Sequence, residues 1–324
     1  MKQSIINYTS LLLYALPYSF ILGPFVSEVL ILICNFSILF IIIKEKEFYF
    51  FKKNLIIFLF LVNIFLIFSS LLSEHILFSL KTSFFYFRWI LLVISIYYLT
   101  YNNQNFLKYL SFNFFVCFLL FFFDSHYQLI FGQNIVGYEI LVPHRISSFF
   151  DDELILGGFI LKILPLLLFC YFIFKKKLNY PKTLFIILIA SSFSVIIISG
   201  ERSAIYLYLI FFSIFFLINL NKFKKELLYF FLIVFISFGS IYIFSENYKS
   251  RIFTNFYNSI SNKIFHNEIG RSKFKNFSLF SFEHEKHITS AYLIFKKSDL
   301  KTKLIGIGPK NFRNFCGIAR FCDY

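Results

Sequence analysis

The chain has 324 residues, of which 58% are hydrophobic and 15% are charged. Soluble domains are roughly half apolar and about a quarter charged, so this composition excludes an ordinary soluble domain. The formal net charge of +15 does not require a nucleic-acid partner, because many of the lysines flank apolar runs, where they set orientation in a membrane. We therefore predict membrane lipid, and no nucleic acid, as a partner.

Apolar runs of about 20 residues recur along the chain, and each could cross a hydrocarbon core of roughly 30 Å. We predict an all-α, polytopic transmembrane helix bundle of about nine spans with an extracytoplasmic loop domain. The predicted spans cover about residues 8–22, 25–43, 54–72, 82–100, 106–123, 153–174, 183–199, 204–219 and 227–244.

Lysine clusters predict the orientation of these spans. They lie at 44–53, 175–177 and 222–225, and lysines of this kind mark the cytoplasmic side. The N-terminus is then cytoplasmic, and residues 1–244 form a bundle whose central loop, 124–152, lies outside. Residues 245–324 form a second, extracytoplasmic domain, since long segments cross a membrane largely regardless of their charge.

Two arginines on the predicted outer face are candidates for binding a phosphate. Arg145 lies in the polar run His144–Ser148 of the central loop, and Arg202 lies in the tight turn between two spans, beside Glu201. The planar donor fork of arginine suits phosphate oxygens, so the two side chains together could hold a pyrophosphate. The alternatives are a lipid-headgroup anchor or solvated residue for Arg145 and a local ion pair for Arg202.

Three consecutive acids, Asp151, Asp152 and Glu153, are predicted to begin the sixth span. Acids in a first helical turn are favoured by the helix dipole, and Asp151 suits the N-cap position. Alternatively, one of the three could act as a base or bind a substrate hydroxyl. The pair Gly157-Gly158 predicts close packing by another helix.

Two further basic residues lie inside predicted spans. Arg88 is about six residues into the fourth span, or about 9 Å deep at the helical rise, and could bind substrate or extend to the membrane surface. Lys162 lies near the middle of the sixth span, where ionisable groups usually face the bundle interior and mark function. Pro165 would loosen that helix locally.

The remaining polar motifs indicate neither a metal nor a cofactor. We interpret Gly306–Phe312 as a turn leading into a helix, because it lacks the ending of a nucleotide-binding loop. His284 and His287 have no matching partners and are predicted to be surface residues. Three cysteines lie in apolar runs and are predicted to be inert packing, namely Cys34, Cys117 and Cys170. In the polar tail, Cys316 and Cys322 could form a disulfide or stay free.

Several of these pieces follow one another in a particular order: Tyr127-Gln128 with Gly132, Arg145–Glu153, Gly157-Gly158 with Lys162 and Pro165, Ser199–Ser203, and Leu304–Phe312. In this order and spacing they resemble the O-antigen ligase and O-antigen polymerase superfamily of bacterial inner-membrane glycosyltransferases. The resemblance covers about residues 50–315.

The resemblance implies an inverting, metal-independent transfer of a glycan from undecaprenyl pyrophosphate to an acceptor hydroxyl. The acceptor would be lipid A–core in a ligase or the growing glycan in a polymerase, and the sequence leaves both open. Arg145 and Arg202 match positions where the family carries arginines, and fixed cations would stabilise the charge that develops on the pyrophosphate. An alternative of another class is a membrane carrier or flippase for lipid-linked sugars.

The same resemblance leaves the general base unassigned. The family's ligases carry a histidine motif beyond a stretch like Leu304–Phe312, and this chain ends at Tyr324 without one. We therefore expect a C-terminally truncated chain that is inactive alone.

Overall fold

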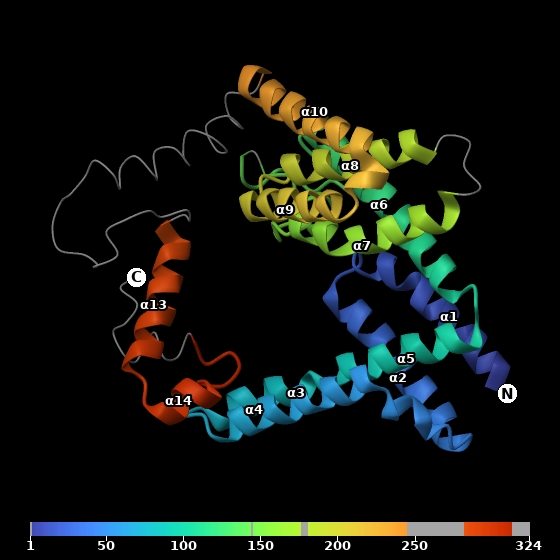
Figure 1. Ribbon diagram of the computed structural model, residues 1–324, viewed down its shortest axis with the longest axis vertical. Coiled ribbons are helices and arrows are strands. Elements are labelled where there is room, and N and C mark those ends of the chain that lie inside the picture. The colour runs from blue at the N-terminus through green and yellow to red at the C-terminus, as the bar shows by residue number, and fades with distance from the viewer. Residues whose placement is uncertain (1, 144, 176–180, 245–281, 313–324) are drawn as a thin grey trace. The chain divides into compact units, whose positions relative to one another are not determined.

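The computed structural model describes residues 2–143, 145–175, 181–244 and 282–312, which form helices and include no β-strand (Figure 1). Most of the connections within these ranges are short, and a longer one, residues 132–155, joins α6 to α7. The elements are α1 (Lys2–Ser19), α2 (Pro24–Lys44), η1 (Phe48–Lys52), α3 (Asn54–Leu71), α4 (Ile76–Phe85), α5 (Phe87–Asn102), α6 (Phe106–Phe131), η2 (Ser148–Phe150), α7 (Leu156–Phe174), α8 (Pro181–Ile198), α9 (Arg202–Ile218), α10 (Leu220–Phe244), α13 (Phe282–Lys297) and α14 (Leu300–Ile305).

Six helical segments are long and apolar enough to cross a membrane. They are α2, α3, the nearly continuous α4 and α5 taken together, α6, α7 and α8, and α9 is a shorter apolar helix. The chain is therefore an all-helical, multi-pass membrane protein by the length and composition of its helices. Helices α1 and α10 coincide with the first and ninth predicted spans but are not among these six, so nine spans remain a prediction.

The helices form two compact units. The described part of the first consists of residues 2–13, 28–104 and 282–312, and that of the second consists of residues 14–27, 105–143, 145–175 and 181–244. These units differ from the predicted domains, 1–244 and 245–324, which separate a membrane bundle from an extracytoplasmic segment. That division remains a prediction.

In the first unit, α3 and α4 lie side by side (Figure 1), and small polar residues lie between them. Ser70 and Ser83 share a short hydrogen bond between their hydroxyls, and the Ser79 hydroxyl donates to Ser70 Oγ at 3.0 Å. Small residues let helix backbones approach closely, and hydroxyls satisfy one another where water is absent. The Ser69 hydroxyl also donates to the Ile305 carbonyl at 2.8 Å, which fastens the end of α14 to this hairpin.

In the second unit, α7 packs against α6, α8 and α9. Aromatic side chains from α8, α9 and α10 fill the adjoining core, including Phe185, Phe212 and Phe230, all buried. The Tyr208 hydroxyl, also buried, donates to the Ile189 carbonyl at 2.8 Å. Helix α7 continues through Pro165 to Phe174, and its first turn lies at the candidate site.

Candidate functional site

Two stretches that are distant in sequence meet at the start of α7: the central loop with the helix that follows it, and the turn between α8 and α9. The backbone amide of Ile146, in the central loop, donates to the Ile198 carbonyl at the end of α8 at 3.3 Å. Glu201, in the turn between α8 and α9, accepts from the Gly157 amide at 2.9 Å and from the Gly158 amide at 3.1 Å. The central loop, the first turn of α7 and the α8–α9 turn therefore form one cluster.

The Glu201 carboxylate caps α7. The first amides of a helix have no partner within the helix, and those of the second and third residues are the ones a capping side chain usually satisfies. Gly157 and Gly158 occupy these positions, because α7 begins at Leu156 and the N-cap residue, Ile155, makes no side-chain cap bond. A carboxylate is also stabilised by the positive end of the helix dipole.

The glycine pair makes this approach possible. A Cβ on Gly157 would lie 2.4 Å from Ser199 Oγ, and a Cβ on Gly158 would lie 3.3 Å from Glu201 Oε2. The prediction that these glycines allow close packing is confirmed, and the segment they admit includes a turn as well as the first residues of α9, where Ala204 lies 3.2 Å from the added Gly157 Cβ.

Two predicted site residues lie electrostatically close to Glu201. Burial raises the pKa of the Glu201 carboxyl above its ordinary value, while the Gly157 and Gly158 amides and the positive charges of Arg145 and Lys162 act in the opposite direction. Lys162 is exposed on α7, one turn beyond Gly158, so the expectation that it faces the bundle interior is not confirmed. The structure thus brings Arg145 and Lys162 to one cluster.

Arg145 retains donor capacity in this cluster. Its side chain is half-buried, Nη2 donates to the Leu154 carbonyl at 3.0 Å, and Nε is buried without a partner. Arg202 is the half-buried first residue of α9. Across the described ranges neither arginine has an acidic oxygen within 4 Å, so the alternative of an Arg202–Glu201 ion pair is not observed.

The prediction that three acids begin the sixth span is wrong. Asp151, Asp152 and Glu153 precede α7 and are exposed, and Asp151 has a φ of 52°. The chain turns here through η2, with the Glu153 amide donating to the Phe150 carbonyl at 2.9 Å. Asp151 is therefore not the N-cap of α7, since Glu201 satisfies the amides that a local cap would serve.

Buried polar residues at the end of α6 hold the central loop, and sequence reasoning assigned them no role. Asp124 accepts from the Ile135 amide at 2.9 Å and from the Ser148 hydroxyl in a short bond. Gln128 accepts from the Ser148 amide at 2.7 Å, and Asn134 donates to the Ser148 carbonyl at 3.0 Å. These bonds hold Ser148 at a φ of 55°, three residues after Arg145. In the sequence, Gln128 stands out only as part of the Tyr127-Gln128 motif, which does not indicate that its side chain holds the loop.

Arg88 belongs to the first unit. Its Nη2 lies 2.8 Å from Glu28 Oε1, and its guanidinium faces the rings of Trp89 at 5.3 Å and Phe85 at 5.9 Å. Asn35 donates to the Arg88 carbonyl at 2.9 Å, so this arginine is fixed by neighbours from α2 and from its own helix.

Some predictions fall outside the described residues: the role of His144, the cytoplasmic lysines 176–177, the segment 245–281, and the pair Cys316 and Cys322. The side chains of His284 and His287 are also outside them. Within the described part of the chain, no three His, Cys, Asp or Glu side chains gather as metal ligands would. The thiols of Cys34, Cys117 and Cys170 are buried and free, which confirms that these residues pack in the interior; their inertness stays a prediction.

Fold and site together define a multi-pass helical membrane protein with a basic cluster at one helix terminus. Comparison of the chain with protein-family models gave no match, and comparisons with curated proteins and with solved structures gave none.

Proposed function

We propose that this protein is a glycosyltransferase of the O-antigen ligase and polymerase type. It transfers or polymerises a glycan carried on undecaprenyl pyrophosphate, by an inverting and metal-independent reaction, with lipid A–core or the growing glycan as acceptor. It resides in the bacterial inner membrane with a cytoplasmic N-terminus, about nine spans, and the cluster at the start of α7 on the outer side.

One observation carries this proposal: the central loop and the α8–α9 turn converge on the start of α7. The bonds from Ile146 to Ile198 and from Gly157 and Gly158 to Glu201 join the two segments that carry Arg145 and Arg202. Two motifs singled out separately in the sequence therefore belong to one part of the fold.

The charges of this cluster suit a reaction in which a pyrophosphate leaves. As the sugar–phosphate bond breaks, negative charge accumulates on the phosphate oxygens, and fixed cations in a partly desolvated place stabilise it. Arg145 is held by the Leu154 carbonyl and by the anchored loop, so little reorganisation is needed when the substrate binds. Lys162 and the acids Asp151–Glu153 are proposed as substrate-binding residues of this cluster. Arg88 lies in the first unit, and its predicted role in substrate binding stays a prediction.

Substitution of the two arginines in the chromosomal gene tests the proposal. Arg145→Ala and Arg202→Ala should each abolish transfer without lowering the amount of protein in the membrane. Arg145→Lys should restore little activity, because an ammonium cannot reproduce the two-pronged contact of a guanidinium with phosphate. Gels of the surface polysaccharide provide the readout. Single-repeat chains would indicate a polymerase, and bare lipid A–core with accumulated lipid-linked polymer would indicate a ligase.

Lys225→Ala is the control. Lys225 is exposed on α10 and, among the described residues, has no acidic oxygen within 4 Å. This variant should retain normal polysaccharide. Normal polysaccharide in Arg145→Ala would refute the assignment of the cluster to catalysis.

A further inference from the structure

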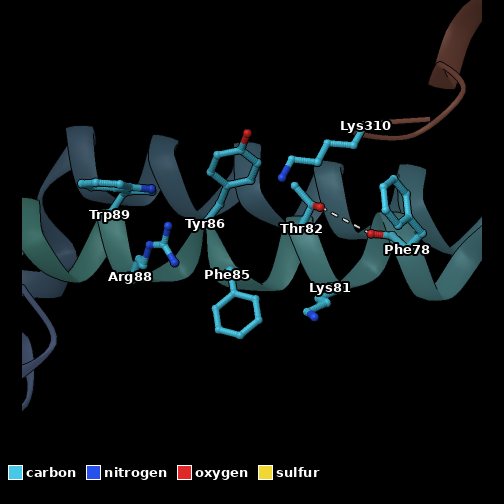
Figure 2. Close-up of a pocket in the computed structure, with 8 residues that line it drawn as sticks. All are labelled: Phe78, Lys81, Thr82, Phe85, Tyr86, Arg88, Trp89 and Lys310. Carbon is cyan, nitrogen blue, oxygen red and sulfur yellow. Dashed lines mark hydrogen bonds between the residues drawn. The ribbon is translucent and has the colours of Figure 1, made fainter. Parts of the chain in front are cut away.

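The first unit contains a second basic site. A cavity of about 390 Å³ is lined by three cations and four aromatic rings, together with Thr82 (Figure 2): Lys81, Arg88, Lys310, Phe78, Phe85, Tyr86 and Trp89. Its volume falls within the range of about 300–1,000 Å³ that is usual for ligand sites.

The cavity is built by two segments that are far apart in sequence. Lys81 and Arg88 lie seven residues apart along α4 and α5, about two helical turns. Lys310 comes from the turn that follows α14, and in Figure 2 its side chain extends toward Tyr86 and Thr82. The third cation is therefore added only because the C-terminal turn docks on this helix.

The docking of that turn is specific. Gly308 has a φ of 84°, and a Cβ on it would lie 2.6 Å from Ser79 Oγ and 2.8 Å from Ser73 Cβ. Ser69 holds the Ile305 carbonyl at 2.8 Å, and buried Asn311 donates to the Ile307 carbonyl at 2.9 Å. Lys310 is thus presented from a fixed backbone.

The charges in the cavity are not balanced by the protein. Of the three cations, Arg88 is paired with Glu28 at 2.8 Å and keeps 29% of its side chain exposed. Lys81 and Lys310 are exposed and, among the described residues, have no acidic oxygen within 4 Å. Two uncompensated positive charges beside aromatic rings favour an anion attached to an apolar body.

We infer that this cavity binds an anionic phospholipid of the surrounding bilayer. Its phosphate lies between Lys81 and Lys310, and its glycerol and upper acyl chain lie along the rings of Phe85 and Trp89. The site is formed largely by a helix apolar enough to span a membrane, so lipid is the phosphate source in permanent contact with it. Basic pockets on membrane helices recognise anionic headgroups in this way. This inference does not depend on the proposed glycan transfer.

Trp89, which lines the cavity, allows lipid binding to be measured by fluorescence. Trp89 is the single tryptophan of the chain, so tryptophan emission, excited at a wavelength where the tyrosines absorb little, reports on this position alone. The full chain is placed in phosphatidylcholine nanodiscs that contain increasing fractions of a bromine-labelled lipid, which quenches tryptophan on contact. The labelled lipid is either phosphatidylglycerol, which is anionic, or phosphatidylcholine, which is zwitterionic, with identical acyl chains.

Labelled phosphatidylglycerol should reach half-maximal quenching at a much lower fraction than labelled phosphatidylcholine. Each basic residue near an anionic lipid contributes about a fivefold preference, the equivalent of about 1 kcal/mol, so two lysines predict a preference of roughly 25-fold. The double variant Lys81→Gln with Lys310→Gln should lose most of it. The control, Lys301→Gln with Lys303→Gln, removes the same charge from exposed positions of α14 outside the cavity and should keep it.

Equal quenching by the two lipids would overturn the inference, as would an unchanged preference in the Lys81→Gln, Lys310→Gln protein. Added inorganic phosphate separates the two sources of phosphate. Release of quenching at millimolar phosphate would show a site for a soluble anion and refute the lipid, whereas unchanged quenching supports the lipid. Unquenched Trp89 emission and the helical circular dichroism signal verify that each variant is folded.

Discussion

Replacing Glu201 should open the start of α7. The carboxylate is the acceptor for the Gly157 and Gly158 amides at 2.9 and 3.1 Å, and Glu201→Ala leaves both without a partner. A hydrogen bond to a charged group contributes about 1.5–3 kcal/mol, and partial exposure of this carboxylate reduces that contribution through solvent screening. For the two bonds together, after this reduction, we expect the free energy of local opening at the start of α7 to fall by about 2–3 kcal/mol. That fall corresponds to amide exchange that is about 30- to 150-fold faster.

Hydrogen–deuterium exchange of the peptide that covers the first turn of α7 measures this directly. Glu201→Gln should give an intermediate increase of about tenfold, because the amide side chain keeps one acceptor oxygen and turns a donor toward the second glycine. The control is Glu153→Gln, which neutralises an exposed acid just before the helix. Unchanged exchange in Glu201→Ala would refute the assignment of Glu201 as the cap.

The same residue predicts a pH dependence. Because burial raises the pKa of Glu201, the folded chain binds more protons than the unfolded chain between the ordinary glutamate value, about 4.3, and the raised value. Stability from this group is therefore greatest below that window and is lost as pH rises through it. As pH rises through this window, the thermal unfolding midpoint of the wild type should fall relative to that of Glu201→Gln. Parallel plots of midpoint against pH for the two proteins would contradict the raised pKa.

Further predictions concern packing and the loop. Gly157→Ala places a Cβ 2.4 Å from Ser199 Oγ, and overpacking of this kind costs about 1–3 kcal/mol. The thermal midpoint in detergent should fall by several degrees, whereas Gly239→Ala, with open space around its Cβ, should not lower it. Asp124→Ala removes the acceptor for the Ile135 amide, so limited proteolysis should cut the loop after α6 faster, while exposed Glu139→Gln should leave the rate unchanged. An equal response of each variant and its control would contradict these assignments.

The helices themselves were largely predictable from the sequence. The runs predicted at 25–43 and 54–72 are α2, Pro24–Lys44, and α3, Asn54–Leu71, because a long apolar segment in a membrane has few alternatives to a helix. The prediction for α6 ended too early, at residue 123, while the helix continues to Phe131. Polar residues after residue 123 suggest a loop, but Asp124 and Gln128 are fully buried and bond to partners within the protein.

The candidate site was predictable only in part. The arginine-bearing segments stand out as polar interruptions, and their residue types suggest phosphate. The capping bond from Glu201 to Gly157 spans 44 residues, and capping rules read from sequence consider only local neighbours. The sequence therefore suggests the local acid Asp151 as the N-cap of α7, whereas in the structure the distant acid Glu201 caps this helix.

The position of Glu201 also limits how an outside anion can be held at this site. Helix N-termini often bind phosphate through their free amides, but α7 offers the amides of Gly157 and Gly158 to a carboxylate of its own chain. An incoming phosphate would have to displace that resident anion, which the chain supplies at a high effective concentration. Recognition at this end of α7 therefore falls to side-chain cations, and a substrate is selected by how well it fits guanidinium groups such as that of Arg145 and not by competition for backbone donors.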